Sequence, residues 1–126
     1  MSKVLAGLTA IVFVMALGAP AFAATETVRG KIVDASCYAK DNTNTGVDHK
    51  MPQDVKDCAI ACAKRGRPMA ILTSDNKVYT IAGELAANNN EKLVGHVSHT
   101  VEVTGDVMTK DGATTIAASA LEMISR

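Results

Sequence analysis

The chain has 126 residues, and its 13 Lys and Arg residues balance 13 Asp and Glu residues, so the formal net charge is zero. A neutral chain has no basic field to attract nucleic acid or anionic lipid, and 3% aromatic residues leave few faces for stacking bases or sugars. Composition therefore argues against nucleic acid as a partner and against a membrane partner for the mature form. A protein or small-ligand partner stays open.

The first 23 residues have the pattern of a secretory signal peptide. Lys3 gives a positive start, an apolar run over residues 4–17 follows, and Ala21-Phe22-Ala23 is the small-x-small sequence that precedes a cleavage site. The apolar run is shorter than the ~20 residues that a membrane-spanning helix needs. We therefore expect cleavage after Ala23, a periplasmic or secreted protein, and one mature domain over residues 24–126.

The mature chain is predicted to begin with a strand and a loop. Residues 27–35 alternate as a strand does, with Val28, Gly30 and Ile32 sharing one face. Residues 40–50 are polar and rich in turn formers, which predicts a loop.

A helix is expected next, between Pro52 and Gly66. Proline fits the first turn of a helix because its missing N–H has no partner there, and glycine commonly ends one. Apolar residues at helical spacing predict a buried stripe, formed by Val55, Cys58, Ala59 and Cys62.

The rest of the chain is predicted to be mainly strands, separated by turn residues and one weak helical turn that three asparagines interrupt. The strands are expected at residues 69–72, 77–82, 100–108 and 114–124, and the helical turn at residues 84–87.

Five short strands with a helical segment between the third and fourth favour a mainly β fold, a small five-stranded OB-like Greek-key barrel. The Cys-bearing helix would be inserted after the first strand. An open α+β sandwich is the alternative. No repeat and no second domain are predicted.

Three sequence motifs of this chain form the basis of a resemblance to other proteins. They are Asp34-Ala-Ser-Cys37-Tyr38, Cys58-Ala-Ile-Ala-Cys62 followed by Gly66, and Val101-Glu-Val103-Thr-Gly105. The chain resembles, over most of its mature length, a group of small exported bacterial domains with an OB-like fold and no established activity. The resemblance implies the fold and the export, and it carries no catalytic residues.

Three cysteines in an exported chain leave one thiol over, because exported cysteines usually pair. Cys58 and Cys62 lie four apart on the predicted helix, where Cβ atoms are roughly 5–6 Å apart, too far for a disulfide without unwinding. Cys37 can reach either one. One interpretation is therefore a disulfide from Cys37 to Cys58 or Cys62, which would make the protein a stapled, non-enzymatic binding module.

The same spacing suits metal binding. Side chains at i and i+4 can hold one ion together, Cys37 adds a third thiolate, and His49 in the loop could supply a fourth ligand. Such a set suits zinc, whereas thiolates with Met51 or Met69 would suit copper(I). Thiol–disulfide exchange is a third, weaker interpretation, because the pair is not C-x-x-C. No catalytic residues are predicted.

His96 and His99 are secondary candidate ligands. On a helical turn their side chains would share a face, whereas on a strand they would point to opposite faces. Because they lead into a strand, we expect solvent-exposed loop histidines.

Overall fold

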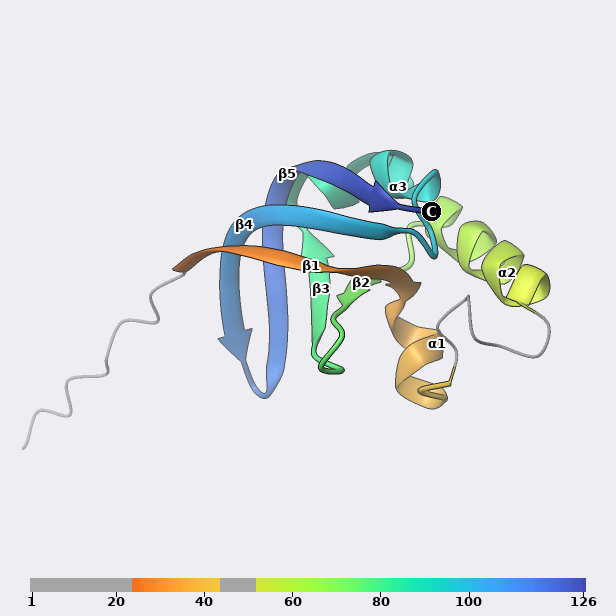
Figure 1. The fold of residues 1–126 in the computed structure, drawn as a ribbon, viewed down its shortest axis with the longest axis horizontal. Helices are drawn as coiled ribbons and strands as arrows, with labels where there is room; N and C mark the ends of the chain where they lie inside the picture. Colours follow the sequence, from red (N-terminus) through yellow and green to blue (C-terminus); the bar gives the residue numbers. More distant parts are fainter. Residues whose placement is uncertain (1–23, 44–51) are drawn as a thin grey trace, which may run out of the picture.

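The computed structural model describes residues 24–43 and 52–126 (Figure 1). The predicted signal peptide, residues 1–23, and the candidate ligand His49 lie outside the described residues. The elements in chain order are β1 (Ala24–Asp34), α1 (Ala35–Lys40), α2 (Pro52–Lys64), β2 (Met69–Leu72), β3 (Val78–Ala82), the 3₁₀ helix η1 (Gly83–Ala86), α3 (Ala87–Val94), β4 (Thr100–Lys110) and β5 (Ala113–Ser125).

The five strands form a closed ring in the order β1-β2-β3-β5-β4. The neighbours are antiparallel except for β3 and β5, which run parallel, so the sheet is mixed. The predicted mainly β class and the five strands are confirmed, as is the helix between the first and second strands. Because the sheet closes on itself, the alternative prediction of an open α+β sandwich was wrong.

The ring is filled from the inward faces of its strands. Val28 and Ile32 of β1 are buried, as the predicted alternation requires. Gly30 lies between them, and a Cβ there would come within 2.3 Å of the Leu72 carbonyl oxygen, so only glycine lets β1 approach β2 this closely. The largest fully buried side chains belong to several elements and are Ile32, Met69, Ile71, Leu85, Leu93, Ile116, Val97, Val101 and Val103.

The α2 helix packs against α3 and β1, at the side of the barrel (Figure 1). Among residues 58–64 of the helix, Ala59 and Ala63 are buried, whereas Cys62 is half-buried and Cys58 is exposed; the side chain of Val55 lies outside the described residues. The predicted stripe was therefore wrong at both cysteines. The helix turns its smallest residues to the core, because alanine allows close packing, and carries its thiols on the flank.

The end of α2 is held by an asparagine from α3. The buried Asn90 amide donates hydrogen bonds to the carbonyls of Ala63 and Arg67, each at 2.9 Å. Asn90 and its two preceding asparagines all have left-handed backbone conformations, with φ between 52° and 57°. Asparagine tolerates this region better than most residues. The predicted interruption by the asparagines is confirmed, and the helical turn that follows them over residues 91–94 was missed.

A short helix that the sequence did not predict, α1, follows β1 directly. Asp34 is its N-cap, and the Asp34 Oδ1 atom accepts a hydrogen bond from the Cys37 backbone N–H at 2.9 Å. The Ala35 backbone N–H donates to the Pro68 carbonyl at 3.1 Å, which fixes where the chain leaves the sheet. Cys37 is therefore a residue of this helix.

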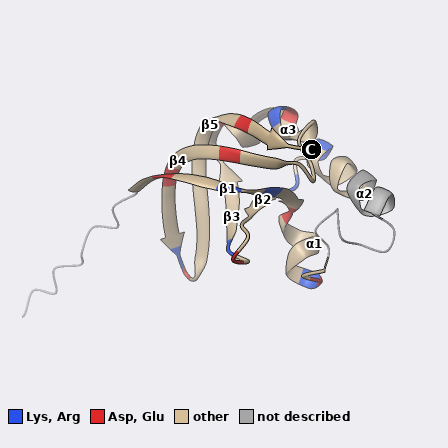
Figure 2. Cartoon of the chain, viewed as in Figure 1, with Lys and Arg blue, Asp and Glu red and all other residues tan. Residues whose placement is uncertain are grey.

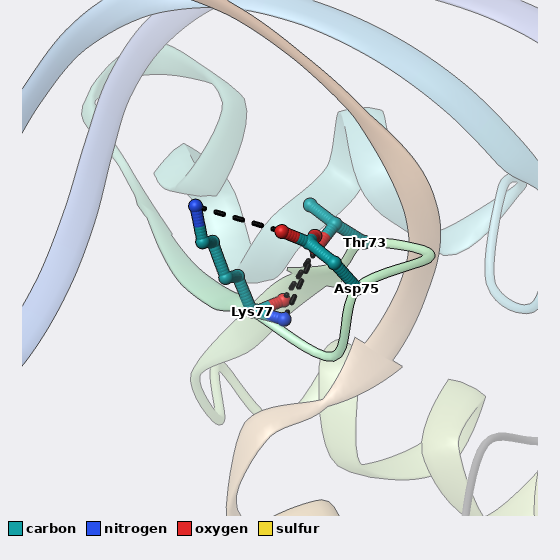
Figure 3. A network of polar contacts seen from close by, with 3 residues as sticks. All are labelled: Thr73, Asp75 and Lys77. Carbon is teal, nitrogen blue, oxygen red and sulfur yellow. Dashed lines mark hydrogen bonds and ion pairs between the residues drawn. The ribbon is translucent and has the colours of Figure 1, made fainter.

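The β2–β3 hairpin is closed by a polar network that Figure 3 shows. The Thr73 hydroxyl lies between the Asp75 carboxylate and the backbone of Lys77, whose N–H donates to it at 3.0 Å. An ion pair joins Lys77 Nζ to Asp75 Oδ2 at 3.5 Å. The hydrogen bond from Thr73 lowers the Asp75 pKa, and the Lys77 charge acts in the same direction.

Charges of both signs are interspersed over the coloured elements in Figure 2, without a one-sign stripe in that view. This distribution agrees with the neutral composition. Within residues 24–43 and 52–126, no helix is long and apolar enough to cross a membrane.

Candidate functional site: a thiol cluster around a buried carboxylate

The candidate site begins at the last residue of β1. Asp34 pairs with Met69 of β2 in the sheet and is only 4% exposed. A carboxylate at this depth normally needs partners for both oxygens, because burying an unpaired charge is costly. Asp34 Oδ1 caps α1, but Asp34 Oδ2 has no hydrogen-bond partner among the described residues.

Two thiols, those of Cys37 and Cys62, interact with this carboxylate, and the third, that of Cys58, interacts with both of them; we call Cys37, Cys58 and Cys62 the thiol cluster. Cys37 is on α1, one turn beyond Asp34, and Cys58 and Cys62 are on α2. Elements separated by the 40–50 segment are therefore brought together at one end of β1. All three cysteines are free thiols in the structure.

Electrostatic interactions connect the cluster to Asp34. Burial raises the pKa of the Cys37 thiol above its usual 9.0, and the negative charges of Asp34 and Cys58 raise it further, while Lys40 acts in the opposite direction. Burial also raises the pKa of Cys62, followed by its contact with the Asp34 carboxylate and the charges of Asp34, Cys58 and Cys37. Burial and the neighbouring negative charges therefore favour the neutral, protonated form of these two thiols.

The contacts between the thiols and Asp34 are loose. They contribute to the raised pKa of Cys37 and of Cys62, but they fall short of hydrogen-bond geometry, because Asp34 Oδ2 is left without a partner. The described residues also contain no group of three or more His, Cys, Asp or Glu side chains already set at metal-ligand geometry. The thiols and the carboxylate are neighbours, and a ligand would have to draw them closer.

The fold also brings His96 and His99 together, in the turn between α3 and β4. Their ring centroids are 6.1 Å apart and their planes meet at 78°. Both residues lie in a turn, as expected, but they are half-buried, so the expected solvent exposure was wrong. The turn is tied to β1, because the Ser98 N–H donates to the Ile32 carbonyl at 2.9 Å. It therefore flanks the end of β1 that carries Asp34.

Of the two methionines considered as copper ligands, Met69 is not part of this group. Met69 is 1% exposed and belongs to the barrel core, which does not favour its thioether as a copper ligand. Met51, like His49, lies outside the described residues.

Asp34 is the residue that the sequence interpretation left out of the site. A signal was present, because an aspartate followed by a short run containing Ala35 and Ala39 is a typical N-cap. An N-cap points its side chain into the first turn of the helix, which is where Cys37 lies.

Comparison with known proteins found no matching family model, no matching curated protein and no matching solved structure.

Proposed function

We propose that this protein is an exported, periplasmic or secreted, OB-like domain that binds one zinc or copper ion through Cys37, Cys58 and Cys62. The single observation that carries the proposal is the proximity of three thiols from two helices, two of which interact with one buried carboxylate. Export is supported by the signal-peptide pattern, and the OB-like fold by five strands in a ring with a helix between the third and fourth.

A bound cation would offset the unfavourable negative charge in the thiol cluster. The charges of Asp34 and of neighbouring thiolates disfavour ionisation of Cys37 and Cys62, and a bound cation would reverse that effect because metals bind thiolates. Thiolates select zinc and copper(I) among the common biological ions. The donor chemistry therefore points to these two metals.

Binding requires a modest rearrangement of side chains. A cysteine has one side-chain torsion with three staggered positions, so a thiol can turn toward a shared ion without movement of the backbone. Cys58 is exposed and has room to do so. The helices supply the rigid part of the site, since Ala59 and Ala63 fix α2 on the core.

Elemental analysis and intact mass test this proposal together. The full chain is expressed, recovered from the periplasm and purified anaerobically. We expect about one zinc or copper ion per chain, protection of the thiols from alkylation until a chelator is added, and loss of the metal in Cys62→Ser. Ala61→Ser places the same new hydroxyl on an exposed position of α2 and is expected to keep the metal.

The two other outcomes are distinct. Metal-free protein with three alkylatable thiols contradicts the proposal. A mass lower by two hydrogens, with a single alkylatable thiol, identifies the disulfide-stapled binding module instead, with Cys37 joined to one of the α2 cysteines.

A further inference from the structure

We propose that Asp34 is the fourth metal ligand, through Oδ2, and that the site therefore takes zinc in preference to copper(I). This inference rests on the proposed function of the thiol cluster. It replaces the role that the sequence interpretation gave to His49, and it names the ion that the three cysteines alone leave open.

The first support is the state of the carboxylate. Asp34 is 96% buried, and its two oxygens have different surroundings: Oδ1 accepts the Cys37 N–H, and Oδ2 has no hydrogen-bond partner in the described part of the chain. A buried polar atom left unsatisfied costs about 1–3 kcal/mol, and more when it is charged. An ion bound at Oδ2 would remove that penalty.

Capping alone does not account for an aspartate here. Asparagine and serine cap helices about as well, and neither would bury a negative charge. The capping bond uses one oxygen and holds the carboxylate in place by the backbone of α1. The second oxygen is left over beside the thiol cluster, because both Cys37 and Cys62 interact with this carboxylate.

The donor set then selects the metal. Structural zinc sites are tetrahedral and accept sulfur, nitrogen and carboxylate oxygen ligands. Three thiolates with one carboxylate carry the same formal charge as the four-cysteine zinc sites. Copper(I) prefers soft sulfur ligands, so a hard oxygen adds little to its binding. Asp34 should consequently strengthen zinc binding and leave copper(I) binding nearly unchanged.

The test compares Asp34→Asn with the wild-type full chain, reduced and stripped of metal, in separate titrations with zinc and copper(I) against competing chelators. Asparagine keeps the oxygen that caps α1 and replaces the other oxygen with an amide nitrogen. We expect zinc affinity to fall by about tenfold or more, since even outer-shell partners contribute 10–100-fold. Copper(I) affinity should change by less than about threefold.

Three further variants complete the design. Asp106→Asn makes the same change on an exposed strand residue and should leave zinc affinity unchanged. His49→Ala should also leave it unchanged. If Asp34→Asn fails to fold, Asp34→Ser provides a capping side chain without a carboxylate.

The outcomes separate the two proposals. A wild-type chain that binds neither ion overturns the proposed function, and this inference with it. Wild-type zinc binding that Asp34→Asn leaves intact, or that His49→Ala abolishes, overturns the role of Asp34 alone. Equal losses of zinc and copper(I) in Asp34→Asn would also contradict it, because they would indicate a damaged scaffold and not a missing oxygen ligand.

Discussion

The hydrogen bonds that Asn90 makes to the end of α2 should be worth a large part of the stability of this domain. Replacing Asn90 with alanine removes a buried amide that donates to the carbonyls of Ala63 and Arg67, each at 2.9 Å. It also places alanine at a φ of 57°, a left-handed conformation that is strained for residues other than glycine, asparagine and aspartate.

The expected loss combines these two effects. Two neutral hydrogen bonds contribute about 1 kcal/mol each, and a left-handed alanine costs about 1 kcal/mol, so Asn90→Ala should lose about 3 kcal/mol. A domain of this size has a total stability of roughly 5–15 kcal/mol. The loss should therefore be plain in a urea denaturation curve of the reduced, metal-free protein, as a lower midpoint with the same slope.

Asn89→Ala is the matched control. Asn89 has nearly the same left-handed conformation, with φ 55°, but its side chain is exposed. Its replacement should cost only the conformational part, about 1 kcal/mol. If Asn90→Ala loses no more than Asn89→Ala, the two amide hydrogen bonds are not holding α2, and the reasoning is refuted.

Three other predictions concern the sheet, the thiols and the hairpin. Gly105→Ala should destabilise the fold by roughly 1–3 kcal/mol, because the new Cβ would lie 2.3 Å from a backbone oxygen of β5, whereas Gly95→Ala, with open space around it, should be neutral in the same denaturation assay. In the reduced, metal-free protein, the rate of Cys37 alkylation should rise with pH with a midpoint above 9.0, and a midpoint below 9.0 would contradict the burial argument. Because the Cys37 thiol ionises at lower pH in the unfolded chain than in the folded one, the free energy of unfolding should also fall as the pH rises above 9.0. The Asp75 carboxyl should titrate below 3.8 by NMR, and its contribution to stability, present above that pH, should disappear as the pH falls through its lowered pKa; a midpoint at or above 3.8 would show that the hairpin network does not act on it.

The strands were the part of the fold that the sequence predicted best. Residues 69–72 were placed correctly as β2, and the other strands to within a few residues, because alternating apolar residues and turn formers are local signals. The parallel pairing of β3 with β5 was not predictable in this way. It depends on which sheet edges meet when the ring closes, and that is a property of the whole chain.

Of the residues in the candidate site, the sequence singled out the cysteines but not Asp34. Helical spacing correctly placed Cys58 and Cys62 on one helix, but it also predicted that they would be buried. Which flank of α2 faces the core is decided by the close approach of Ala59 and Ala63, and small residues give no strong hydrophobic signal. Asp34 was overlooked because its burial results from its place at the end of β1, beside β2, and not from its neighbours in sequence.

The two oxygens of Asp34 connect the stability of this fold to its proposed function. One oxygen starts α1 and so positions Cys37, a contribution that any capping residue could make. The other is buried beside the thiols without a partner, which lowers the stability of the metal-free protein. The stability that Asp34 Oδ2 costs in the metal-free protein would have to be regained in another state of the protein. Because zinc binds carboxylate oxygen as well as thiolate sulfur, the metal-bound state is where that compensation would occur. The same residue would then make the domain less stable without its ion and more selective for zinc with it.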